Sequence, residues 1–209
     1  MKILRWVLRV LVALLAVAVV LLAIASLFLR RVTTDDMAPT LLPGDLVWIV
    51  PLAPTRGDIV RLPDPNDPSH YVLRRIVAEP EQKVRFDEGG LRVNGKRVRQ
   101  QDPTSADGVI TTKETIWSKP PARACTWYVL RADREPTWKT QPYEVPANQW
   151  YVLADNREWA LDSRWWGAVD ASTVTGVVRL RIGPPDELGT KKDQPHRGPV
   201  TFLKGVPVD

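Results

Sequence analysis

The residues of this chain that are best suited to chemistry lie in two polar segments, Thr34–Asp45 and Asp155–Arg164. The first opens with a hydroxyl and two adjacent carboxylates, and the second alternates carboxylates with guanidinium groups and contains one serine. Such groups can transfer protons, attack a carbonyl carbon or hold a carbonyl oxygen, depending on which of them meet. Because the segments stand far apart in the sequence, only the fold can bring them together.

Four blocks of sequence resemble the type I signal peptidases of peptidase family S26, in the order in which that family carries them. The first block reads MAPTLLPGD, where the family has Ser-Met-x-Pro-Thr-Leu-x-x-Gly-Asp. The last reads LADNREWALDSRWWG, where the family usually has Gly-Asp-Asn-Arg-Asp-Asn-Ser-x-Asp-Ser-Arg-x-Trp-Gly. The blocks cover Met37–Asp45, Arg56–Val60, Arg75–Lys96 and Leu153–Gly167. The resemblance implies a membrane-anchored β protein that acts on signal peptides of exported proteins, with a serine nucleophile and a lysine base and without a cofactor.

The residues that would carry this chemistry are replaced. The alignment puts Asp36 at the position of the nucleophilic serine, Arg74 at that of the lysine base, and Ala160 at that of the serine that orients the lysine. A carboxylate side chain has no hydroxyl to activate, and arginine stays protonated in proteins, so it cannot accept the proton. The resemblance therefore implies a degenerate member with no intact catalytic dyad.

Part of the family's binding site remains. The resemblance assigns Thr34 to the position whose hydroxyl stabilises the oxyanion, next to Asp36 and Met37, and an oxyanion site without a nucleophile can still hold a carbonyl. Asp36 and Arg74 place opposite charges where the dyad would meet. We predict that they form a salt bridge, in which the arginine fork offers the carboxylate two hydrogen bonds.

The second polar segment is predicted to hold structure rather than to perform chemistry. In the family the corresponding residues form ion pairs and turn contacts near the site, and they are here Asp155, Asn156, Arg157, Asp162, Ser163 and Arg164. Asp162 and Arg164 would lie on one face of an extended segment. His70 and His196 have no cluster of metal-ligating residues around them, so no metal site is predicted.

Composition narrows the class of partner. The formal net charge is +5, but much of the excess lies beside the apolar segment, and the sequence carries no motif for nucleic acid. Membrane lipid is therefore the expected partner and nucleic acid is not. Cys125 is the only cysteine, so no internal disulfide can form. Trp159, Trp165 and Trp166 would either belong to the core or lie at the level of the lipid headgroups.

One segment is predicted to cross the membrane. Residues 10–29, Val10 to Leu29, carry no charge, and a helix of that length spans about 30 Å. Three basic residues within 1–9 place the N-terminus in the cytoplasm and the main domain outside the cell membrane. Ala23-Ile24-Ala25 would suit a cleaved signal peptide, but the apolar run continues past it, which favours an uncleaved anchor.

The rest of the chain is predicted to be mostly β. Residues 32–183 form an antiparallel domain, with an inserted subregion at about 99–147 and a polar, loosely held tail at 184–209. The hairpin signal is strongest at Asn94-Gly95. Strands are expected at Asp45–Val50, Asp58–Leu62, Tyr71–Val77, Lys83–Phe86, Leu91–Val93, Val109–Thr112, Trp127–Leu130, Trp150–Leu153 and Thr173–Ile182.

Three functions are compatible with these observations. The first is an inactive signal peptidase homologue that binds extended or signal-peptide-like segments at the membrane surface, in export or in assembly of surface structures. The second is an active signal peptidase with a different catalytic arrangement, using a residue such as Ser163 or Lys83. The third is a structural membrane subunit.

Overall fold

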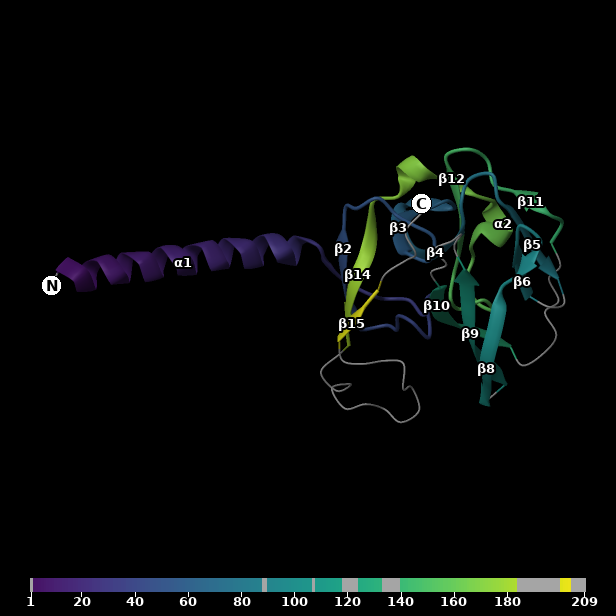
Figure 1. Ribbon diagram of the computed structural model, residues 1–209, viewed down its shortest axis with the longest axis horizontal. Coiled ribbons are helices and arrows are strands. Elements are labelled where there is room, and N and C mark those ends of the chain that lie inside the picture. Colours follow the sequence, from purple (N-terminus) through teal and green to yellow (C-terminus); the bar gives the residue numbers. More distant parts are fainter. Residues whose placement is uncertain are drawn as a thin grey trace.

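The computed structural model describes residues 2–87, 90–106, 108–117, 124–132, 140–183 and 200–203. Its first element is the helix α1 (Lys2–Leu27), which projects from the β body as a single rod (Figure 1). The stretch Ile3–Ile24 is long and apolar enough to cross a membrane, and the body covers none of it. The helix begins before Val10, the predicted start of the span, because long basic side chains are compatible with a helix. It ends before Leu29, which enters a strand.

The body is built from antiparallel sheets, as predicted. The largest follows the order β1-β2-β14-β3-β4-β12-β13, and β15 adds to β14. Its strands are β1 (Leu29–Arg31), β2 (Leu46–Val50), β3 (Ile59–Asp64), β4 (Asp67–Ala78), β12 (Gln149–Leu153), β13 (Val169–Asp170), β14 (Gly176–Ile182) and β15 (Val200–Phe202). The last of these lies within the segment expected to be a loosely held tail, so this part of it is paired.

Two smaller sheets complete the body on the side away from α1 (Figure 1). One has the order β11-β5-β6-β7 and the other β10-β9-β8. Their strands are β5 (Lys83–Asp87), β6 (Gly90–Val93), β7 (Lys96–Arg97), β11 (Tyr143–Glu144), β8 (Arg99–Ala106), β9 (Val109–Trp117) and β10 (Ala124–Ala132). Thus β8 to β10, all inside the predicted subregion, pair among themselves, whereas β11 pairs with β5 before it.

The predicted hairpin at Asn94-Gly95 is confirmed. Val93 pairs with Lys96 across it, so the two residues form the whole turn. Their φ angles are 50° and 74°, the left-handed values that a type I′ turn requires at both central positions. Short helical turns were not predicted: α2 (Ser163–Trp166) and the 3-10 turn Ala171–Thr173 each follow a capping aspartate.

Alternating side chains give the main sheet one buried and one open face near α1. Val47 and Ile49 of β2 point into the core. On the other face a row of apolar residues runs across four paired strands, from Leu29 through Trp48 and Leu180 to Phe202. Phe202 is 83% exposed. This row, which we call the apolar row, lies directly after the end of α1.

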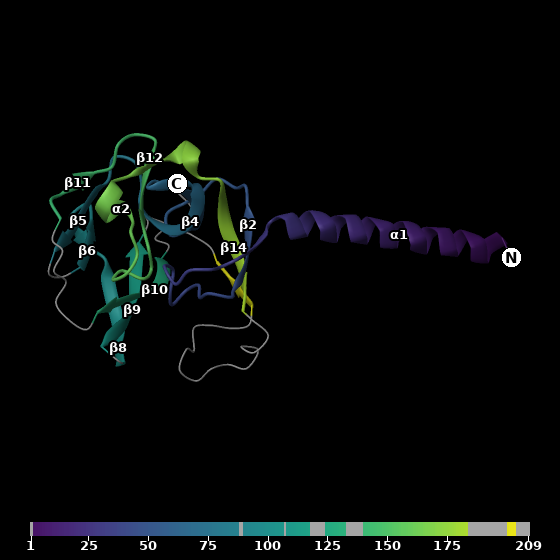
Figure 2. The same cartoon turned by 180° about the vertical axis from the view of Figure 1, so that it is seen from behind.

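The tryptophans of the second polar segment are arranged differently. Trp159 and Trp165 are exposed, whereas Trp166 is half-buried and packs against a core cluster that includes Ile76 and Val152. Figures 1 and 2 show α2, which carries Trp165, on the opposite side of the body from α1. Trp166 therefore belongs to the edge of the core.

Candidate functional site

The loop that carries Asp36 is held at both ends and in its middle. Its base closes where the Val32 N–H donates to the carbonyl of Asp45 at 2.8 Å. Met37 and Leu41 are buried in a core cluster under β2, and burying such a side chain contributes about 1.5–3 kcal/mol. The Asn156 N–H then donates to the Asp36 carbonyl at 2.9 Å, which joins the two polar segments. The backbone of Asp36 is therefore fixed.

Arg74 reaches this loop from β4. Its Nη1 donates to Oδ2 of Asp36 at 3.0 Å, so the predicted salt bridge is confirmed. The Asp36 side chain is 25% exposed and that of Arg74 only 3%. The predicted two-bond fork was wrong, because only Nη1 donates to Asp36. The Nε group donates instead to the Leu161 carbonyl at 2.8 Å, and Nη1 also donates to the Leu73 carbonyl at 2.6 Å.

The other predicted site residues lie around this pair in different ways. Thr34 is exposed, and no described residue hydrogen-bonds its side chain. Ala160 is buried and offers only a methyl group, while its carbonyl accepts a bond from Arg164 Nη2 at 3.3 Å. Met37 serves as a core anchor. Asp36 and Arg74 thus meet directly, whereas the Thr34 side chain has no hydrogen bond to either within the described part of the chain.

No hydrogen bond or ion pair joins the alternative nucleophile Ser163 or the alternative base Lys83 to Asp36 among the described residues. Ser163 is buried, and its Oγ accepts the Val152 N–H at 3.0 Å. Lys83 is exposed on β5, in another sheet, where its Nζ lies 3.6 Å from Glu144. Both side chains therefore have structural partners of their own.

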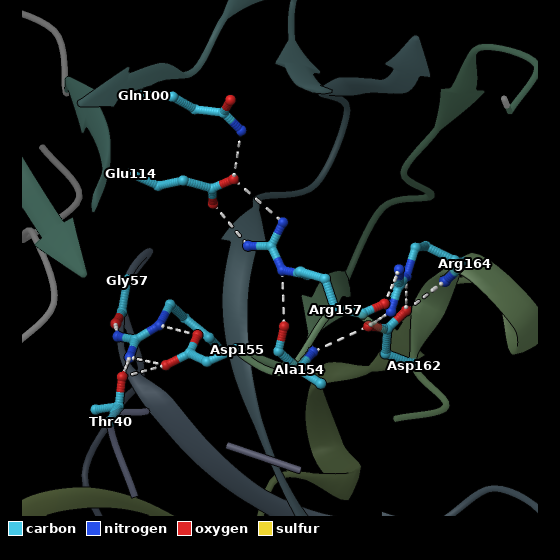
Figure 3. A network of polar contacts seen from close by, with 10 residues as sticks. Thr40, Gly57, Gln100, Glu114, Ala154, Asp155, Arg157, Asp162 and Arg164 are labelled. Carbon is cyan, nitrogen blue, oxygen red and sulfur yellow. Dashed lines mark hydrogen bonds and ion pairs between the residues drawn. The ribbon is translucent and has the colours of Figure 1, made fainter. Parts of the chain in front are cut away.

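The residues predicted to be structural form a connected network of ion pairs, shown in Figure 3. The Asp155 carboxylate accepts two hydrogen bonds from Arg75, one from Nε at 2.8 Å and one from Nη2 at 2.5 Å. It accepts a third from the Thr40 hydroxyl at 2.6 Å. Arg75 Nη1 also donates to the Gly57 carbonyl at 2.7 Å. Burial alone would lower the pKa of the Arg75 guanidinium, but the Asp155 carboxylate outweighs burial and holds that pKa above its ordinary value.

Two further pairs extend the network. Arg157 Nη2 donates to Glu114 at 2.7 Å and so ties the second polar segment to β9 (Figure 3). Asp162 accepts from both Nε and Nη2 of Arg164, at 2.8 and 2.9 Å, and from the Ala154 N–H at 3.0 Å. The Asp162–Arg164 pair was predicted on an extended segment, but it lies at the start of α2, because Asp162 caps that helix.

Several partners in this network were not predicted from sequence. Arg75, Thr40 and Glu114 stand in strands or loops far along the chain from the carboxylates and guanidinium they bind. The one available signal was that Arg75 leads directly into the apolar run Ile76–Ala78, since a charged residue in such a place is rarely buried without a partner.

The described residues offer no cluster of side chains for a metal ion, since they contain no group of three metal-ligating side chains. His70 pairs with Asp67 at 2.8 Å on an exposed hairpin, and His196 lies outside the described residues. Burial raises the pKa of the Cys125 thiol and of the Tyr151 phenol, so both stay protonated near neutral pH.

A sequence model of one protein family, described as signal peptidase, peptidase S26, matches residues 3–182. The chain belongs to this family. A probable signal peptidase I-2 from Synechocystis is 28% identical over 182 residues, which cover 82% of this chain and 70% of that protein. Signal peptidase I P from Bacillus subtilis subsp. natto is 27% identical over 193 residues, which cover 90% of this chain and 92% of that protein.

The solved structures that are similar to this chain include that of a signal peptidase I from Enterococcus faecalis. It has a TM-score of 0.38 and 24% identity, and the match covers 61% of this chain and 98% of that one. The antiparallel β body and the N-terminal apolar helix agree with membership of the S26 family.

Proposed function

We propose that this S26-family chain does not act as a Ser/Lys peptidase and instead binds extended, signal-peptide-like segments at the membrane surface, in export or in assembly of surface structures. The observation that carries the proposal is the contact between Asp36 and Arg74. A carboxylate and a guanidinium 3.0 Å apart supply neither an activated hydroxyl nor a neutral amine. The positions that the family uses for chemistry are occupied by a stable ion pair.

The open edge of β4 supports peptide binding. The backbone of Ile76 in β4 bonds to Gly57 and Asp58 on the β3 side, and the direction of backbone N–H and C=O groups alternates along a strand, so Arg74 and Val72 also face β3. Tyr71 and Leu73 therefore turn their backbone groups to the opposite edge. There β12 pairs with β4 only from Arg75 onward, so the described part of the chain places no strand beside Tyr71 and Leu73. An extended peptide can add to such an edge.

Two features support attachment to a membrane. The helix α1 is long and apolar enough to span one, with Lys2, Arg5 and Arg9 near its start. The apolar row presents its exposed side chains directly after that helix. Basic residues on the N-terminal side favour a cytoplasmic N-terminus, which places the β body outside the cytoplasm. A reporter fused after Asp209 should then be accessible only from outside.

The deciding experiment incubates the purified full-length protein in detergent with a preprotein that carries an Ala-x-Ala cleavage site. We expect no cleavage. The triple variant Asp36→Ser, Arg74→Lys, Ala160→Ser restores nucleophile, base and orienting hydroxyl, so it should be the first to cleave, whereas the single variants should not. Cleavage by the unmodified protein that disappears with Ser163→Ala or Lys83→Ala would refute the proposal.

Peptide binding is measured separately, by photo-crosslinking an extended peptide with small residues at alternating positions. The crosslink should map to β4 near Tyr71 and Leu73. N-methylation of alternate peptide nitrogens should abolish it, because strand addition depends on those N–H groups. A charged, scrambled peptide that crosslinks equally well would contradict specific binding.

A further inference from the structure

We propose that the site formed by Asp35, Asp36 and Asn156 binds a protonated amine, either the α-ammonium group of an extended peptide or a lysine side chain. The inference rests on the proposed peptide-binding function and names the chemical group that the site selects. Several hydrogen-bond acceptors at this site have no donor among the described residues, and they determine which ligand fits.

Asp36 has acceptor capacity to spare. Arg74 reaches only Oδ2, and within the described residues no donor lies at Oδ1. With a quarter of the side chain exposed, this oxygen can be reached from solvent. Asp35 adds a second, exposed carboxylate in the adjacent position, and no described residue pairs with that side chain. Two carboxylates against one guanidinium leave a local excess of negative charge.

Asn156 provides an independent observation. The residue is 97% buried, since only 3% of it is exposed, and both its backbone nitrogen and its Nδ2 face this loop. The backbone N–H donates to the Asp36 carbonyl at 2.9 Å, and Nδ2 donates to the Asp35 carbonyl at 3.3 Å. The remaining oxygen, Oδ1, is buried and has no donor among the described residues. A buried acceptor without a donor is destabilising, and a ligand N–H that binds it would remove that cost.

Oδ1 of Asp36, the Asp35 carboxylate and Oδ1 of Asn156 are all acceptors, so the ligand that complements them is a donor with positive charge. An ammonium group has three N–H donors and no acceptor. A divalent metal ion fits poorly, because Ca²⁺ takes six to eight oxygen ligands and the Arg74 guanidinium already lies 3.0 Å from Asp36. An anionic ligand would meet the two carboxylates. The atoms present therefore select an amine.

The geometry of Arg74 also places the end of a peptide here. Its side chain leaves β4 and binds the carbonyls of Leu73 and Leu161, so it crosses the open edge at which a peptide would add. A peptide strand that pairs with Tyr71 and Leu73 would run into the Arg74 side chain and could not extend past it in the same direction. A first residue, whose α-ammonium is attracted by Asp36, can stop at that point.

The test measures binding of three peptides to the full-length protein in detergent by isothermal titration. All three have small residues, an amidated C-terminus and the same length. One has a free N-terminus and no lysine, one is N-acetylated without lysine, and one is N-acetylated with a single lysine. We expect the free or the lysine peptide to bind at least about tenfold more tightly than the acetylated one, as charged hydrogen bonds allow. Which of the two does so identifies the source of the amine.

The preference should disappear in Asp36→Asn, which keeps the shape and an acceptor for Arg74. It should weaken in Asp35→Asn, whose exposed side chain is not needed for folding, so that variant decides if Asp36→Asn does not fold. Glu144→Gln is the matched control, because Glu144 is also ion-paired but lies on β11, and it should keep the preference. Equal affinity for all three peptides would overturn the amine site and leave peptide binding intact. Failure of all three to bind would overturn both proposals.

Discussion

Arg74 and Arg75 are neighbours on one strand, yet their ion pairs differ in almost every respect. Arg75 is enclosed in the core, where it gives Asp155 two hydrogen bonds and Gly57 a third. Arg74 gives Asp36 a single hydrogen bond at the edge of solvent. Successive side chains of a strand point to opposite faces, so the same residue type enters two environments.

The difference separates a pair that holds the fold from one that occupies a site. In the Arg75 pair both carboxylate oxygens are used, and Thr40 satisfies Asp155 further. In the Arg74 pair one carboxylate oxygen has no described donor. A side chain with unused acceptors and solvent access can bind a ligand, whereas a fully bonded one cannot without losing a contact that the fold requires.

Breaking the enclosed pair should have the largest effect. Asp155→Ala leaves the Arg75 guanidinium buried without its carboxylate, and removal of one partner of a buried pair typically costs about 3–5 kcal/mol. We expect the variant to unfold in detergent at a much lower temperature, as followed by circular dichroism, or not to accumulate. Glu144→Gln, which removes half of an exposed pair, should be close to neutral. A loss no greater than that of the control would mean that Asp155 is not needed by the core.

Breaking the Asp36–Arg74 pair, which is only partly exposed, should cost less, and a second substitution should reverse part of the loss. Asp36→Ser leaves Arg74 without its anion, and Arg74→Lys removes the bonds to Leu73 and Leu161 that depend on the guanidinium. We expect each single variant to lower the melting temperature more than the double variant does. Contacting residues typically show a coupling energy of about 0.5–3 kcal/mol. Additive losses in the double-mutant cycle would show that the two side chains do not stabilise one another.

The contrast also shows what the sequence can and cannot predict. The salt bridge between Asp36 and Arg74 was predictable, because the family resemblance placed both residues at positions that must meet. Its single-bond geometry was not, since the competing carbonyls of Leu73 and Leu161 are set by tertiary packing. Glu114, the partner of Arg157, lay in a segment without any recognised motif. Long-range pairing of charges leaves no periodic pattern in one sequence.

The fold was predictable to a similar degree. Strands with clear alternation, such as β2 and β5, were found close to their observed bounds. The strands β1, β7, β11, β13 and β15 have only two or three residues each, too few for a pattern to show. Some of these matter for the site and its surroundings, because β1 leads into the loop that carries Asp36.

We expect the smallest effect on stability from a change beside Asp170, whose carboxylate is hydrogen-bonded but exposed. It represents a third environment, beside the buried Asp155 and the partly exposed Asp36. Asp170 accepts from the Ser172 hydroxyl at 2.6 Å and from its backbone N–H at 2.8 Å, and these bonds lower the pKa of Asp170 below its ordinary value of 3.8. A group whose pKa is lower in the folded state stabilises the fold above the unfolded pKa, and that contribution is lost as the pH falls through the folded pKa. Ser172→Ala removes one of the two donors. We therefore expect a slight drop in melting temperature at pH 6 that shrinks as the pH is lowered below about 4. A drop of equal size at pH 6 and pH 3 would show that Ser172 acts by packing rather than through the charge of Asp170.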